Sequence, residues 1–209
     1  MIKEKEILFQ MNQKRFLKRI HIDSEKKQDE ELRERVLWLE EQMRSQTIQM
    51  VYRKGEGDFS LGIREMDDCP VQIVCLVSIG EKLNQKIDGF FAEEKYLEAY
   101  LLDQMASDAL FFASEKLNEM LCRDMKSEGW YLVQKAEAGE GDIPLERQKD
   151  FLDIIRAECD IGVRVNDAGV LLPEKTMVYA FSADKEGKEL CLNHDCRQCS
   201  RKDCGFRME

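Results

Sequence analysis

The sequence predicts an α+β fold in which helices pack around a mostly antiparallel sheet. A long helical pattern runs from about 94 to 125, and the unbroken apolar and β-branched run VQIVCLVS at 71–78 is typical of a strand buried on both faces. Three short strand-like segments then follow one another near the C-terminal end, which favours antiparallel pairing. Because strand–helix–strand alternation is sparse, the α+β class is favoured over a parallel α/β fold.

The remaining elements follow from apolar spacing and from turn residues. The glycine-punctuated segment 54–62 is expected to be a loop or hairpin connection, and Asp142 and Pro144 are expected to begin a helix. Helices are predicted at 12–20, 28–51, 81–89 and 145–158, and strands at 129–134, 161–165, 169–173 and 176–181. We expect one α+β domain over 1–185 and a cysteine-rich tail over 186–209.

Composition and charge exclude some classes of function. The 209 residues carry a net charge of −10, and no basic stripe rises above this acidic background, so a nucleic-acid-binding surface is not expected. No apolar run approaches the roughly 20 residues that span a bilayer, and the first residues lack the apolar core of a signal peptide. We therefore expect a cytoplasmic protein that does not contact a membrane.

The segment 135–144, KAEAGEGDIP, lies between two helical patterns and is the strongest candidate for a ligand-binding loop. Its two glycines allow a backbone that approaches another molecule closely. A simple glycine turn ahead of a helix explains the same residues equally well.

Four segments in the same order resemble the activation domain of cobalamin-dependent methionine synthase and its short stand-alone relatives. The segments are CLVSIGEKLNQKIDGFF, YLEAYLLDQMASDALFFASEKLNEML, KAEAGEGDIPLERQKDFLDII and VNDAGVLLPEKTMVYAF, and the resemblance covers about 12–185. It implies a domain that binds S-adenosylmethionine and docks over a corrinoid held by a partner. There it supports reductive methylation of oxidised cobalamin, so the chain is a methyltransferase activation component if it is active.

The resemblance also implies ligand-binding residues. In that family an arginine, a Pro-Gly-Tyr turn and a later proline bind S-adenosylmethionine, and a tyrosine follows in a later strand. The matching positions here are Lys135, Ala138, Gly139, Glu140, Pro144 and, for the later tyrosine, Phe181.

Two of these positions change the chemistry of the segment. Lys135 replaces a bidentate guanidinium by a point charge, which weakens recognition of a carboxylate but leaves one charge-assisted bond. Glu140 replaces an aromatic ring by a negative charge, which disfavours an anionic group or instead favours the sulfonium. Asp103, in a Leu-Leu-Asp sequence that also marks the short relatives, is a secondary candidate, although a carboxylate on an amphipathic helix more often faces solvent.

The C-terminal tail has the spacing of a metal site. Cys191, Cys196, Cys199 and Cys204 lie close enough in sequence for their thiolates to reach one ion or cluster. A four-iron cluster, which could pass an electron to the corrinoid, is the first choice. A zinc knuckle that uses His194 or the fourth cysteine, and an unmetallated tail of reduced thiols, are the alternatives.

Two functions remain open at this stage. One is an accessory protein that reactivates a cobalamin-carrying methionine synthase or a related corrinoid protein with S-adenosylmethionine. The other is a non-catalytic binding module with a degenerate ligand site and a structural zinc tail. The sequence shows no cobalamin-ligating module of its own, so cobalamin is expected only on a partner.

Overall fold

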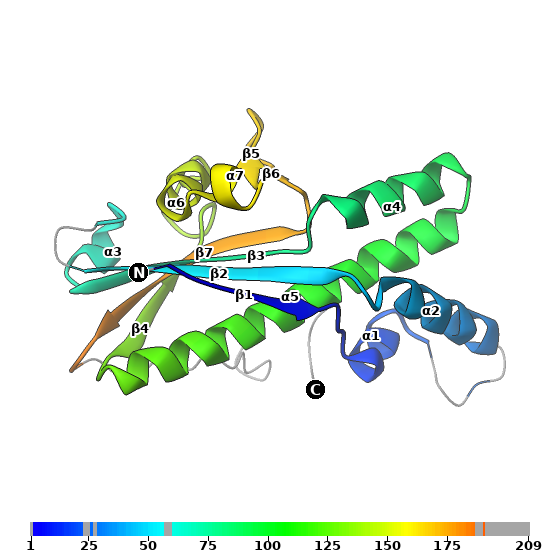
Figure 1. The fold of residues 1–209 in the computed structure, drawn as a ribbon, viewed down its shortest axis with the longest axis horizontal. Coiled ribbons are helices and arrows are strands. Elements are labelled where there is room, and N and C mark those ends of the chain that lie inside the picture. The colour runs from blue at the N-terminus through cyan, green and yellow to red at the C-terminus, as the bar shows by residue number, and fades with distance from the viewer. Residues whose placement is uncertain (1, 23–25, 27–28, 57–59, 187–189, 191–209) are drawn as a thin grey trace.

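A computed structural model describes residues 2–22, 26, 29–56, 60–186 and 190 of the chain, with only the backbone of Glu56 and Glu65. At its centre is a five-stranded sheet in which all neighbouring strands are antiparallel (Figure 1). From edge to edge the strands are β1 (Ile2–Leu8), β2 (Thr47–Glu56), β3 (Val71–Ser78), β7 (Thr176–Asp184) and β4 (Tyr131–Ala136). The predicted α+β class with a mostly antiparallel sheet is confirmed.

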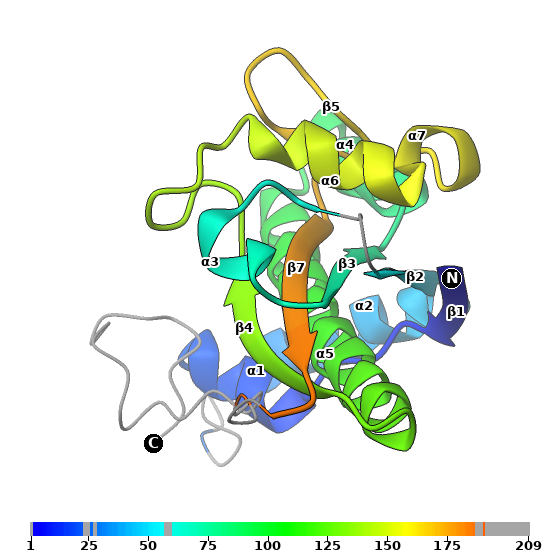
Figure 2. The same cartoon turned by 90° about the vertical axis from the view of Figure 1, so that its left-hand side faces the viewer.

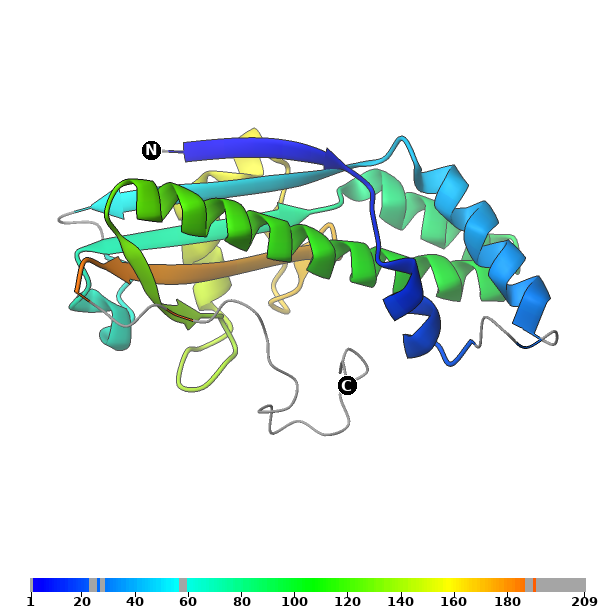
Figure 3. The same ribbon diagram turned by 90° about the horizontal axis from the view of Figure 1, so that it is seen from below.

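Helices cover the sheet on both faces. The 32-residue helix α5 runs along one face, and α6 and α7 lie across the other (Figures 1, 2 and 3). The helices on the α5 side are α1 (Gln13–Arg19), α2 (Glu30–Met43), α4 (Glu81–Ala92) and α5 (Tyr96–Ser127). The remaining elements are α3 (Arg64–Asp67), α6 (Arg147–Ile155), α7 (Ala157–Asp160) and the two-stranded sheet of β5 (Arg164–Val165) and β6 (Leu171–Leu172).

The central strand β3 separates two apolar cores. Successive side chains of a strand point to opposite faces, so Cys75 packs under α5 whereas Val74 and Leu76 pack under α6. All eight residues of β3 are buried, and the strand lies between β2 and β7. The prediction that 71–78 is a strand buried on both faces is therefore confirmed.

Two parts of the fold differ from the predictions. The helix expected over 28–51 ends at Met43, and 47–51 belongs to β2, where Ile48 and Met50 face the core under α5. Met50 follows Met43 by seven residues, so the helical spacing continues by coincidence across the turn into the strand. Strand β1 was not expected, because its charged residues and half-exposed edge position leave a weak pattern.

Two buried or half-buried carboxylates fix α5 in place. Asp108 is fully buried and accepts hydrogen bonds from Arg15 Nε at 3.1 Å and from the Asn12 backbone N–H at 3.2 Å, which ties α1 to α5. Near the other end of α5, Asp124 Oδ2 accepts a 2.6 Å hydrogen bond from Tyr52 Oη and a 3.0 Å bond from Lys3 Nζ. The long helix is thus attached by polar contacts both to α1 and to the β1–β2 edge of the sheet.

Candidate functional site

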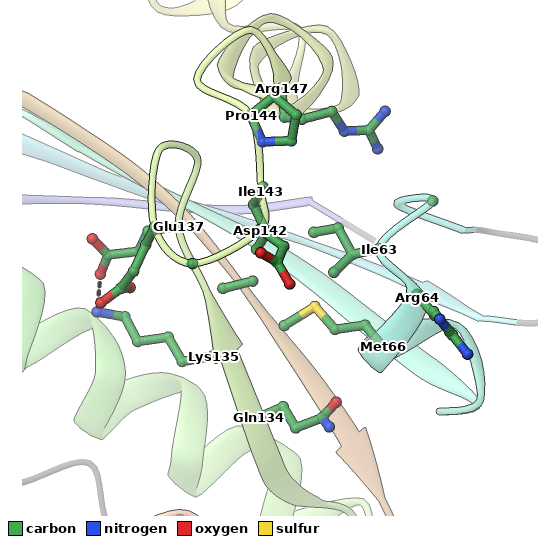
Figure 4. Close-up of a pocket in the computed structure, with 14 residues that line it drawn as sticks. Ile63, Arg64, Met66, Gln134, Lys135, Glu137, Asp142, Ile143, Pro144 and Arg147 are labelled. Carbon is green, nitrogen blue, oxygen red and sulfur yellow. Dashed lines mark hydrogen bonds and ion pairs between the residues drawn. The ribbon is translucent and has the colours of Figure 1, made fainter.

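A cavity of about 740 Å³ lies on the α6 side of the sheet, between α3 and the loop that follows β4 (Figure 4). We call it the β4–α6 cavity. Its apolar wall comes from Ile63, Met66 and Ala136, which belong to the core under α6. The other lining residues are Gly62, Arg64, Gln134, Lys135, Glu137, Glu140, Gly141, Asp142, Ile143, Pro144 and Arg147. Most of the segment 135–144, which the sequence marks as a ligand-binding loop, therefore borders a cavity.

The loop after β4 is a tight double turn. Gly139 and Gly141 have φ values of +85° and +58°, which side chains rarely adopt. The Gly139 N–H donates to the Ile143 carbonyl at 2.9 Å, and the Ile143 N–H donates to the Glu140 carbonyl at 3.1 Å. A Cβ at Gly139 would lie 3.2 Å from Leu145 Cδ1. The glycines therefore let the loop fold back on itself against Leu145.

Pro144 begins the turn that leads into α6. The Arg147 N–H donates to the Pro144 carbonyl at 3.1 Å, and the helix itself starts at Arg147 with Glu146 as its N-cap residue. The expected helix start near Leu145, with Asp142 as N-cap, is therefore wrong, because one extra turn separates Asp142 from the helix. This leaves Asp142 on the loop, with its carboxylate directed from the loop toward Ile63 and Met66 (Figure 4).

The charged residues of the cavity divide into those that pair with each other or with a neighbour and those that do not. Lys135 Nζ forms an ion pair with Glu137, and Arg147 Nη1 lies 2.8 Å from Asp150 Oδ2. Within the part of the chain that the structure describes, Arg64, Glu140 and Asp142 form no ion pair. One guanidinium and two carboxylates at the cavity are thus available to a ligand.

Lys135 directs its ammonium group away from the cavity. Its Nζ lies 4.8 Å from the centroid of the Tyr179 ring, and Tyr179 belongs to the core under α5, on the opposite side of the sheet from Met66. Figure 4 shows the Lys135 side chain running from β4 to meet Glu137, apart from Arg147 and Ile63. The residue borders the cavity, but its charge is held on the other face.

The other residues suggested by the sequence occupy three different environments. Ala138 packs against the core under α6, just behind the turn. Phe181 is fully buried under α5, directly opposite Lys135 in the register of β7 and β4. Asp103 lies on α5, outside the cavity lining, and forms a 2.7 Å ion pair with Lys175, which directly precedes β7. The structure thus brings Glu140 and Pro144 together at the cavity, while Phe181 and Asp103 lie elsewhere.

Sequence reasoning missed the two arginines that line the cavity. Arg64 lies on the short helix α3, and Arg147 lies at the start of α6 (Figure 4). Arg147 Nη2 donates to the Leu61 carbonyl, and a Cβ at Gly62 would lie 3.2 Å from the same nitrogen. This contact ties the start of α6 to the connection between β2 and β3. No local signal in the sequence relates residues 61–64 to residues 140–147, which meet only in the folded chain.

The tail cysteines 191, 196, 199 and 204 lie outside the described residues. Their point of attachment is described, because the Leu190 N–H donates to the Leu132 carbonyl of β4 at 2.6 Å. Among the residues that the structure describes, no three His, Cys, Asp or Glu side chains are arranged to hold a metal ion, and no helix is long and apolar enough to cross a membrane.

Comparisons with known proteins identify the fold. No protein-family model matches the chain, and no curated protein matches it significantly in sequence. Among solved structures, the crystal structure of the MetH reactivation domain bound to AdoHcy superimposes with a TM-score of 0.65. The two sequences are 9% identical over a match that covers 91% of this chain and 80% of that chain. The chain therefore has the fold of the MetH reactivation domain.

Proposed function

We propose that this chain binds S-adenosylmethionine in the β4–α6 cavity and supports reductive methylation of a corrinoid carried by a partner protein. The observation that carries this proposal is the position of the cavity. It is bordered by the loop 135–144, to which the family resemblance assigns the ligand, in a chain with the fold of a domain solved with AdoHcy bound. Its volume of about 740 Å³ also falls within the roughly 300–1,000 Å³ of small-molecule sites.

The loop and the apolar wall have distinct parts in this proposal. Ile63 and Met66 offer an apolar surface to the adenine ring, while Glu140 and Pro144 border the ligand from the loop. Gly139 gives the loop its shape. Lys135 stabilises the strand that carries the loop, because its ammonium group pairs with Glu137 and lies over Tyr179.

The proposed reaction needs one electron and one methyl group. A low-potential one-electron donor reduces the partner's Co(II) corrinoid to Co(I), which then takes the methyl group from the sulfonium. The sulfur–carbon bond breaks, a cobalt–carbon bond forms, and S-adenosylhomocysteine remains. In this scheme the present chain binds and orients the methyl donor, and the corrinoid belongs entirely to the partner.

Calorimetric titration with S-adenosylmethionine tests the binding step. We expect saturable binding by the wild-type chain and at least a tenfold loss in Asp142→Trp, whose indole would fill part of the cavity from a side chain exposed on the loop. Asp167→Trp, on an exposed loop outside this cavity, is the matched control and should bind normally. Absence of binding by the folded wild-type protein would contradict the proposal.

A methyl-transfer assay tests the accessory role. The chain would be mixed with a methionine synthase that has been oxidised to the Co(II) state, a one-electron reductant and S-adenosylmethionine labelled in its methyl group. We expect label on the corrinoid only when this chain is present. If the labelled methyl group reaches the corrinoid at the same rate without the chain, the accessory role is rejected even if the chain binds S-adenosylmethionine.

One observation favours the second candidate, a non-catalytic binding module. The Lys135 ammonium is directed to the α5 side, so the cavity does not receive the basic group that the resemblance places there. A module of this kind would keep the fold and show no saturable binding of S-adenosylmethionine. The calorimetric titration above therefore separates the two candidates.

We also propose that the four tail cysteines hold a metal centre, with an iron–sulfur cluster as the first choice. The proposal is supported by their spacing, which keeps four thiolates within a short segment that starts next to the Leu190–Leu132 contact at β4. Metal and acid-labile sulfide analysis of protein purified without oxygen is the test. Iron with sulfide supports the cluster, zinc without sulfide assigns a structural knuckle, and protein free of metal rejects the site.

A further inference from the structure

The charges that remain unpaired at the β4–α6 cavity have a specific composition. Lys135 and Arg147 form ion pairs with Glu137 and Asp150. The other charged residues that line the cavity are one cation, Arg64, and two anions, Glu140 and Asp142. At neutral pH, S-adenosylmethionine carries the opposite set, with one carboxylate, one ammonium and one sulfonium. S-adenosylhomocysteine has the same carboxylate and ammonium but a neutral thioether.

We propose that the cavity discriminates in favour of the sulfonium form of the ligand, and that Glu140 and Asp142 are the specificity-determining residues. This inference rests on the proposed function. A thioether ligand leaves one of the two carboxylates without an opposite charge, whereas the sulfonium supplies it. In a reductive methylation cycle such a preference would release the demethylated product and retain the methyl donor.

The positions of the charged residues support this assignment. Glu140 and Asp142 flank Gly141 on the turn after β4, and the Asp142 carboxylate is directed toward the apolar wall at Ile63 and Met66 (Figure 4). Arg64 lies across from the loop, on α3. In the proposed pose the cations of the ligand lie near the loop and its carboxylate lies near α3. Arg64, whose side chain points away from the loop in Figure 4, turns its guanidinium toward this carboxylate when the ligand binds.

The magnitude follows from the exposure of the carboxylates. Both are exposed on the loop, so each interaction with the sulfonium is screened by solvent and salt. We expect a preference of roughly fivefold for S-adenosylmethionine over S-adenosylhomocysteine at low ionic strength, in the range of exposed charge pairs. The preference should shrink as salt is added, because the Debye length falls to about 8 Å at physiological ionic strength.

Titration of both ligands into the wild-type chain and into Glu140→Gln and Asp142→Asn tests the inference. Each variant should lower the affinity for S-adenosylmethionine. The variant at the carboxylate next to the sulfonium should leave the affinity for S-adenosylhomocysteine nearly unchanged, whereas the variant at the carboxylate next to the ammonium should weaken the binding of both ligands. Glu174→Gln removes the same charge from an exposed site outside the cavity and should keep the wild-type ratio. Sinefungin, which carries an ammonium in place of the methylsulfonium, should bind like S-adenosylmethionine because the charge and not the methyl group is recognised.

Arg64→Gln provides a separate readout. Since both ligands carry the same carboxylate, this variant should lower the affinity for both to a similar extent and leave the ratio of the two affinities unchanged. Equal affinity of the wild-type chain for the two ligands overturns the charge-based specificity while the proposed function stands. A preference that survives in the Glu140→Gln, Asp142→Asn double variant overturns the assignment to these residues. Failure of both ligands to bind overturns the proposed function itself, and the specificity with it.

Discussion

The Lys135 ammonium lies 4.8 Å from the centroid of the Tyr179 ring, on the α5 side of the sheet, although the loop that Lys135 precedes borders a cavity on the α6 side. Alternate residues of a strand face opposite sides, so Ala136 faces the cavity and Lys135 does not. The position to which the sequence resemblance assigns a ligand-binding arginine thus carries its charge on the other face. The same strand geometry places Phe181, opposite Lys135, in the core under α5.

The first prediction concerns this lysine. Lys135→Met removes the charge and keeps the aliphatic stem that packs on Tyr179, so we expect the affinity for S-adenosylmethionine to change by less than about twofold. Loss of the ion pair and of the cation–π contact should cost about 1 kcal/mol of stability. Calorimetry and urea denaturation measure the two effects. A tenfold loss of affinity would instead place the lysine in direct contact with the ligand.

The second prediction concerns the backbone of the loop. Gly139→Ala puts a Cβ at a φ of +85° and 3.2 Å from Leu145 Cδ1, so we expect a loss of about 1–2 kcal/mol in the free energy of unfolding. The turn should also shift, which lowers ligand affinity. Gly89→Ala is the matched control, because Gly89 lies inside α4 with open space for a Cβ, and it should stabilise the protein by about 0.5–1 kcal/mol. Equal stability of the two variants would show that the turn at Gly139 is not strained by a side chain.

The third prediction concerns the attachment of α1 to α5. Asp108 is fully buried and binds both Arg15 and the Asn12 backbone, so Asp108→Ala should destabilise the protein by about 3 kcal/mol by leaving these donors without their acceptor. Glu119→Ala, on an exposed face of the same helix, should change stability by less than about 0.5 kcal/mol. Denaturation with urea measures both. A small effect at Asp108 would mean that water replaces the lost carboxylate at the α1–α5 contact.

The sequence predicts the fold well in segments whose apolar pattern is compatible with a single secondary structure. The run 71–78 is apolar except for Gln72 and Ser78, and its side chains fill the apolar cores on both faces of the sheet. The spacing in 94–125 likewise identifies α5 within two residues at each end. Strand β1 was missed because its exposed face and its edge position call for charged residues such as Lys3 and Glu4, which dilute the alternation.

The candidate site could be predicted only in part. The glycines and proline of the loop indicate a special backbone, and the loop does border the cavity. The guanidinium on the opposite side comes from Arg64, in a segment next to the glycine-rich connection that gives no local sign of its partner. Residues 64 and 140 are brought together by the pairing of β3 with β7 and of β7 with β4, a long-range relationship that a single sequence does not contain.

The last prediction concerns pH and the attachment of α5 to the sheet. Burial alone would raise the pKa of Asp124, but the hydrogen bonds from Tyr52 and Lys3 outweigh it and hold the pKa below its usual value of 3.8. A carboxylate whose pKa is depressed in the folded state contributes stability above its unfolded pKa and loses it as pH falls through the folded value. We therefore expect the wild-type chain to lose stability between about pH 5 and pH 3 more steeply than Asp124→Asn, which cannot titrate at this position.

Urea denaturation at pH 7, 5 and 3 measures this difference. Asp124→Asn should be less stable than the wild-type chain at pH 7, because the amide binds Lys3 and Tyr52 more weakly than the carboxylate does, and the gap should narrow toward pH 3. Glu119→Gln, which removes a carboxylate paired with Lys116 on the exposed face of α5, should follow the wild-type curve. Parallel curves for the wild-type and Asp124→Asn proteins would mean that the Tyr52 and Lys3 contacts do not depress the pKa of Asp124 in the folded state.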